Sequence, residues 1–167
     1  MNIGAGRIVK QDLVKINEDI SSGKFLNNPV LINLFSNLDK NHTLHLIGLL
    51  SDGGVHSHID HLYYLLKVAK NYGINNVAIH VITDGRDTPP SSGVSFISEL
   101  ESKIKSIGIG KIATICGRYY MMDRDNRWDR SEKAYKALVD GEGEYFVNAI
   151  EAIQDSYNDN ISDEFVK

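Results

Sequence analysis

The sequence is poor in cysteine, in long apolar runs and in excess positive charge. Its 167 residues include one cysteine, Cys116, which cannot form an internal disulfide, so we expect a reducing compartment. No apolar run approaches the roughly 20 residues that a membrane-spanning helix needs, and no signal-peptide pattern opens the chain. A net charge of -4 argues against nucleic acid or an anionic membrane as a partner. We therefore expect a soluble, cytoplasmic protein.

The composition is nevertheless sufficient for a hydrophobic core. At 42% hydrophobic residues, a chain of 167 residues can bury roughly 70% of its unfolded surface as one domain. Cys116 lies in an apolar run, so we expect it to pack in this core rather than act as a nucleophile. We expect a single α/β domain over residues 1–167, with an acidic, Asn-rich end after Gln154 that frays.

A strand-loop-helix pattern occurs three times in succession after Thr43. Short runs rich in Ile, Leu and Val, typical of parallel strands covered on both faces, lie at residues 44–50, 76–83 and 111–116. Apolar residues at helical spacing predict helices at residues 58–71, 91–107, 128–139 and 147–157.

Two further helices are predicted before this pattern, at residues 11–21 and 29–40. Strands alternating with helices indicate an α/β fold. The fold class expected is an open, mostly parallel sheet with helices on both faces, preceded by a helical segment.

Polar loops follow the three predicted strands, at residues 51–58, 84–90 and 117–130. In open α/β sheets, ligands bind outside the carboxyl ends of the strands. Because these ends meet at one edge, we expect the loops to bring five side chains to one site: His56, Arg86, Asp87, Arg118 and Arg124.

The third loop is the part of the chain that is densest in charge. Planar guanidinium groups match the oxygens of a carboxylate or phosphate, and neighbouring aspartates can hold them in position. This pattern favours a small anionic ligand. The alternative is an exposed loop crossed by surface ion pairs, each worth about 0 to 1 kcal/mol. The charged residues are Arg118, Asp123, Arg124, Asp125, Arg127, Asp129 and Arg130.

Residues 56–61 spell His-x-His-x-Asp-His, which is the zinc-binding signature of the metallo-β-lactamase class of hydrolases. Such sites need further ligands downstream, and the only later histidine is His80, inside a predicted strand. We therefore prefer His58 and His61 as helix-capping or packing residues. His56 lies earlier in a Gly-Gly loop and is the histidine most able to reach a ligand.

Four segments together resemble the 2,3-bisphosphoglycerate-independent (cofactor-independent) phosphoglycerate mutases: residues 2–7, 48–58, 84–90 and 117–130. The resemblance implies a two-domain isomerase, with an α/β domain inserted into an alkaline-phosphatase-like domain that holds two Mn²⁺ and a serine nucleophile. This chain is similar to the inserted domain alone. We therefore expect it to be truncated at both ends, with no metal site of its own and with the phosphatase-like domain of the same polypeptide as its partner.

The resemblance also implies roles for the loop residues. His56, Arg86, Asp87, Arg118 and Arg124 are expected to bind 2- or 3-phosphoglycerate, with Asp87 as the catalytic proton-transfer group and His56 able to share that work. The complete enzyme would interconvert the two phosphoglycerates in glycolysis through a phosphoserine, and the isolated chain would be inactive or nearly so. Two alternatives are a free-standing anion-binding module and the zinc hydrolase. Side chains expected only to fix the loop are Arg127, Trp128 and Arg130.

Overall fold

The computed structural model describes residues 2–39 and 41–167. Contacts divide the chain into two compact units, Met1–Leu38 and Asp39–Lys167, so the assignment of residues 1–167 to one domain remains a prediction. The first unit contains α1 (Asn2–Ala5), α2 (Asp12–Ser21), the 3-10 helix η1 (Lys24–Asn27) and α3 (Pro29–Asn37).

Helix α3 begins where the sequence predicts. Pro29 occupies its first turn, where a missing N–H costs nothing, and the Asn28 side chain accepts a hydrogen bond from the Val30 N–H at 2.9 Å. The helix ends at Asn37, and its predicted last residue, Lys40, lies outside the described residues.

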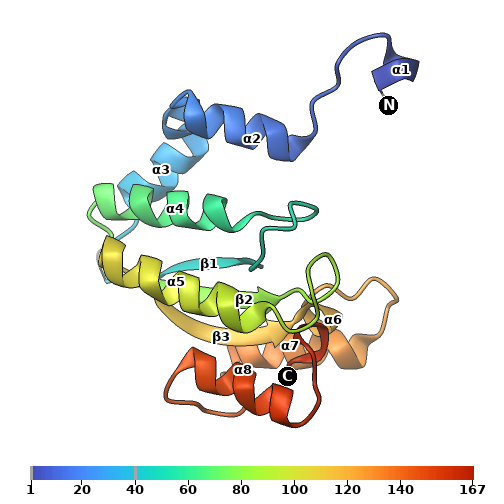
Figure 1. Ribbon diagram of the computed structural model, residues 1–167. Coiled ribbons are helices and arrows are strands. Elements are labelled where there is room, and N and C mark those ends of the chain that lie inside the picture. The colour runs from blue at the N-terminus through green and yellow to red at the C-terminus, as the bar shows by residue number, and fades with distance from the viewer. Residues whose placement is uncertain (1, 40) are drawn as a thin grey trace. The chain divides into compact units, whose positions relative to one another are not determined.

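The second unit is built on a three-stranded parallel sheet in the order β1-β2-β3 (Figure 1). The central strand is buried at every position, as the apolar runs predicted. The strands are β1 (Leu44–Leu49), β2 (Val77–Thr83) and β3 (Lys111–Gly117), each within one residue of the prediction at either end.

Helices cover both faces of this sheet. Because parallel crossovers are right-handed and the strands follow in sequence, the two crossover helices lie on one face, where they contact each other. On the other face, Cys116 of β3 packs with Tyr120 and Ala134. The fold class is thus confirmed, and the helices are α4 (Ile59–Asn71), α5 (Gly93–Ile107), α6 (Arg118–Met121), α7 (Trp128–Val139), α8 (Ala149–Asn158) and the 3-10 helix η2 (Asp163–Phe165).

Cys116 packs in the core, as predicted. Burial raises the pKa of its thiol to about 11, so the group stays protonated at neutral pH and is a poor nucleophile. In the described part of the chain, no helix is both long and apolar enough to cross a membrane.

The end of the chain is ordered, and the expectation that it frays was wrong. The C-terminal segment, residues 159–167, crosses the carboxyl ends of β2 and β3. The Thr83 hydroxyl donates to the Asp163 carbonyl at 2.6 Å, and the Gly117 N–H donates to the Val166 carbonyl at 2.7 Å. Asp163 and Val166 are buried, so the polar composition of this segment did not reveal its anchoring.

Asp163 also explains where α5 begins. The prediction placed the start at residue 91, whereas the helix begins at Gly93. The Gly93 N–H donates to the Asp163 carboxylate at 2.8 Å, and the Tyr157 hydroxyl donates to the same carboxylate. The carboxylate satisfies a first-turn N–H that has no partner within the helix, and it comes from 70 residues further along the chain.

Candidate functional site

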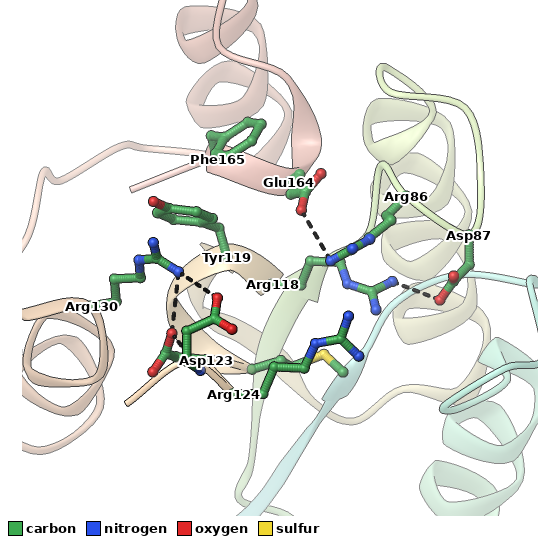
Figure 2. A pocket seen from close by; sticks show the side chains of 11 residues that line it. Arg86, Asp87, Arg118, Tyr119, Asp123, Arg124, Arg130, Glu164 and Phe165 are labelled. Atoms are coloured by element: carbon green, nitrogen blue, oxygen red, sulfur yellow. Dashed lines mark hydrogen bonds and ion pairs between the residues drawn. The ribbon is translucent and has the colours of Figure 1, made fainter. Parts of the chain in front are cut away.

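A cavity of about 510 Å³ opens where β2 and β3 end (Figure 2). Four of the five predicted site residues line it: Arg86 and Asp87 from the loop after β2, Arg118 at the start of α6, and Arg124 from the loop after α6. His56 does not line the cavity, but its Nε2 lies 3.9 Å from the Asp87 Oδ2. The topology therefore brings the predicted residues to one place.

Arg118 is the most buried of the cavity's arginines. Its Nη1 donates to the Asp84 Oδ1 and to the Asp87 Oδ2, both at 2.6 Å, and only 8% of its side chain is exposed. One positive charge thus lies between two carboxylates, and this trio carries a net negative charge. Arg118 fixes the geometry of Asp87, and it is a weaker attractor of anions than an unpaired arginine.

Asp84 holds the cluster of Arg118 and Asp87 in place. Its carboxylate is buried and accepts hydrogen bonds from the Ser51 hydroxyl at 2.7 Å and from the N–H groups of Asp87 and Arg86 at 3.0 and 3.2 Å. Burial alone would raise the pKa of Asp84. The hydrogen bonds from the Asp87 N–H, Ser51 and Arg118 outweigh burial, so the pKa lies below its ordinary value. The carboxylate therefore stays charged at neutral pH and fixes the start of the loop.

Replacing Asp84 by asparagine should make the folded state less stable by about 1 to 3 kcal/mol at neutral pH. The folded-state pKa of Asp84 lies below the unfolded value of 3.8, so its charge stabilises the fold above pH 3.8. That contribution is lost as the pH falls through the folded-state pKa. Urea unfolding between about pH 2.5 and 7 should show the difference from wild type shrinking in acid. A difference that is independent of pH would contradict this assignment.

Arg130 has a structural role, as the sequence predicted. Its Nη1 lies 3.2 Å from the Asp123 Oδ1, and its guanidinium lies 3.9 Å from the centre of the Tyr119 ring. Asp123 also accepts the Arg127 N–H at 2.8 Å. These contacts fix the loop between α6 and α7 (Figure 2). They also pair the positive charge of Arg130 with groups of the cavity wall, so less of that charge is available to a ligand.

Arg86 and Arg124 are the cations that remain available to a ligand. The Arg86 side chain is 55% exposed, and its Nη1 lies 3.7 Å from the Glu164 Oε1. Arg124 makes no ion pair with any carboxylate in the described part of the chain. Both can therefore turn a guanidinium toward an oxyanion without breaking a buried pair.

Comparison with known proteins identifies the family. The sequence family described as the BPG-independent PGAM N-terminus matches residues 16–167. The chain belongs to this family. It is 58% identical over 167 residues to the 2,3-bisphosphoglycerate-independent phosphoglycerate mutase of Lachnoclostridium phytofermentans, a match that covers 99% of this chain and 32% of that protein. The mutase of Clostridium perfringens is 57% identical, with 99% and 33% covered.

A solved structure shows the same fold. The crystal structure of Leishmania mexicana phosphoglycerate mutase at low cobalt concentration superposes with a TM-score of 0.88 and 34% sequence identity. The match covers 96% of this chain and 31% of that one. The chain thus spans about a third of the length of the phosphoglycerate mutases that it matches.

His58 and His61 have the capping and packing contacts that were predicted for them. His58 caps α4, because its Nδ1 accepts the Asp60 N–H at 3.2 Å. Among residues 2–39 and 41–167, no group of three His, Cys, Asp or Glu side chains is placed to hold a metal ion. The His58 and His61 rings pack at 5.8 Å between centroids.

Several residues of the site were not predicted from the sequence. Asp84 and Ser51 stand directly after predicted strands, so their position was a usable signal. Tyr119 lies inside the arginine-rich stretch. Glu164 and Phe165 gave no signal, because they join the cavity from the C-terminal segment, far along the chain from the loop that carries Arg86.

Proposed function

We propose that this chain is the substrate-holding, transferase part of a cofactor-independent phosphoglycerate mutase. The proposed reaction is the interconversion of 3-phosphoglycerate and 2-phosphoglycerate in glycolysis. The observation that carries the proposal is the convergence of Arg86, Arg118 and Arg124 with Asp87 around one cavity, in a chain of this family. A cytoplasmic location is part of the same proposal.

The arginines of the cavity differ in how they could contact a phosphoglycerate. Arg124 and Arg86 are accessible guanidinium groups that can bind the carboxylate or the phosphate through paired hydrogen bonds. Arg118 holds Asp87 Oδ2 and so orients that carboxylate. The loop geometry thus prepares both the binding groups and a proton acceptor.

Asp87 is the proposed proton-transfer residue. Its side chain is 19% exposed and lines the cavity, so it can take a proton from, or return one to, the hydroxyl that exchanges the phosphoryl group. His56 lies 3.9 Å away and can share this work. Binding to Arg86 and Arg124 would hold the glycerate while it reorients between transfers.

The remaining chemistry is proposed to reside in the rest of a longer polypeptide. The matching mutases are about three times as long as this chain. We assign the serine nucleophile and two Mn²⁺ to the phosphatase-like domain, as the family resemblance implies. The metals would supply electrostatic stabilisation of the transferred phosphoryl group. The chain alone should therefore bind substrate weakly without turning it over.

Substitution of Arg124 by alanine should weaken binding of 3-phosphoglycerate by about 1.5 to 3 kcal/mol, or roughly 10- to 150-fold. The reason is the loss of a charge-assisted contact from an arginine that no carboxylate of residues 2–39 and 41–167 pairs with. We would titrate 3-phosphoglycerate into the 167-residue chain and follow amide and arginine side-chain NMR signals, which detect weak binding.

The matched control is Arg127→Ala, because Arg127 lies in the same loop and its guanidinium contacts only the exposed Asp129, at 3.4 Å, among the described residues. It should bind 3-phosphoglycerate as the wild type does. Equal affinity of wild type and Arg124→Ala would contradict the proposed site. Mutase turnover by the wild-type chain alone would contradict the assignment of the nucleophile to another domain.

A further inference from the structure

Glu164 is one of the carboxylates on the wall of the cavity, which also include Asp87, Asp123 and Asp125. Its Oε1 lies 3.7 Å from the Arg86 Nη1, and 21% of its side chain is exposed. Figure 2 shows Glu164 directed at Arg86, with Phe165 beside it above the Tyr119 ring. A carboxylate in this position repels an external anion, so its presence beside Arg86 needs an explanation.

The backbone holds Glu164 in this position. Gly85 and Gly117 lie so close to the C-terminal segment that an added Cβ would come within 2.8 Å of the Glu164 N–H nitrogen and 2.7 Å of its carbonyl carbon, respectively. Asp163 and Val166, which lie before and after Glu164 in the chain, are buried and hold the segment in place. The segment therefore holds the Glu164 backbone at a fixed place near Arg86, while the Glu164 side chain can still turn.

The ion pairs that line the cavity differ in how easily a ligand could displace the carboxylate from its arginine. Arg118 is held by two carboxylates at 2.6 Å and is almost fully buried. Arg130 is held by Asp123 and by the face of Tyr119. The Arg86–Glu164 contact, at 3.7 Å, is longer than the contacts of Arg130 to Asp123 and Asp125, at 3.2 and 3.4 Å, and Arg86 is the most exposed of these three arginines, so this is the weakest pair of the set.

We propose that Glu164 is an internal, exchangeable ligand of Arg86 that sets how tightly the cavity holds an external oxyanion. The Glu164 carboxylate keeps the Arg86 guanidinium directed toward the cavity, and a ligand's carboxylate or phosphate replaces it. Glu164 is thus a positioning and affinity-determining residue. This inference rests on the proposed function, because it takes the cavity as an oxyanion site.

The first test is the affinity of Glu164→Gln for 3-phosphoglycerate and, separately, for inorganic phosphate, followed by NMR on the 167-residue chain. Removing the competing charge should tighten binding roughly twofold to fivefold. Glu144→Gln is the matched control, since Glu144 is exposed and outside the cavity, and it should bind as wild type does. Unchanged or weaker binding by Glu164→Gln would overturn the inference.

A double-mutant cycle separates exchange from general repulsion. If Glu164 acts through Arg86, the gain from Glu164→Gln should vanish in an Arg86→Ala background. A gain that persists there would mean that Glu164 repels the ligand directly, and the exchange would be refuted. Without any ligand, Glu164→Gln should also shift the Arg86 side-chain N–H signal but not that of Arg124, and an unshifted Arg86 signal would count equally against the pair.

These outcomes are distinguishable from a failure of the proposed function. If Arg86→Ala and Arg124→Ala both leave oxyanion binding unchanged, the cavity is not the binding site and both proposals fall. If those substitutions weaken binding while Glu164→Gln has no effect, only the role of Glu164 is refuted. If Glu164→Gln binds more tightly, and this gain disappears in an Arg86→Ala background, both proposals are supported.

Discussion

Replacing Arg118 by methionine should destabilise the chain by about 3 to 5 kcal/mol. Methionine fills much of the same space but leaves the Asp84 and Asp87 carboxylates without the guanidinium that lies 2.6 Å from each. The Asp84 side chain is only 1% exposed, so water cannot replace the lost partner. Since domains are typically stable by about 5 to 15 kcal/mol, this loss should be visible as a large fall in the urea midpoint.

Arg127→Met provides the control for removing an arginine from the same region. Arg127 and Asp129 form an exposed pair with side chains 58% and 68% accessible, so its loss should cost no more than about 1 kcal/mol. Adding Asp84→Asn to Arg118→Met should recover part of the lost stability, because the buried uncompensated charge is then removed. Equal stabilities of Arg118→Met and Arg127→Met would show that the buried cluster contributes little.

The fold was predictable because its signals are local. Apolar runs of strand length mark β1, β2 and β3, and the alternation with amphipathic helices fixes a parallel sheet. One error lies where a distant group decides a boundary. Helix α5 begins two residues later than predicted, where the Asp163 carboxylate binds the Gly93 N–H. No local pattern records a contact across 70 residues.

The location of the candidate site was predictable from the sequence, but the ion pairs between its arginines and carboxylates were not. Parallel topology alone brings the loops that carry Arg86 and Arg118 to one edge, which is why four of the five predicted residues line one cavity. Sequence cannot show that Arg118 lies between Asp84 and Asp87 while Arg124 has no carboxylate partner among the described residues. Those differences depend on burial and on distances of a few ångströms, and they decide which arginine can meet a ligand.

Gly117→Ala should destabilise the chain by about 3 kcal/mol or detach the C-terminal segment. The backbone of Gly117, at φ -68° and ψ 147°, suits any residue, so the effect comes from space alone. An added Cβ would lie 2.7 Å from the Glu164 carbonyl carbon and 2.8 Å from the Val166 nitrogen. Both are backbone atoms that cannot rotate away, and the Gly117 N–H to Val166 carbonyl hydrogen bond would be lost as they separate.

Gly48→Ala is the matched control, because an added Cβ at Gly48 meets no atom within 4 Å. In a strand, alanine should be neutral or slightly stabilising relative to glycine. Urea unfolding measures the global cost, and carboxypeptidase digestion with mass analysis reports release of the C-terminal segment. The cost of Gly117→Ala is limited by the free energy of detaching that segment, since detachment relieves the clash. A variant that is as stable and as protease-resistant as Gly48→Ala would refute the close packing that holds Glu164 at the cavity.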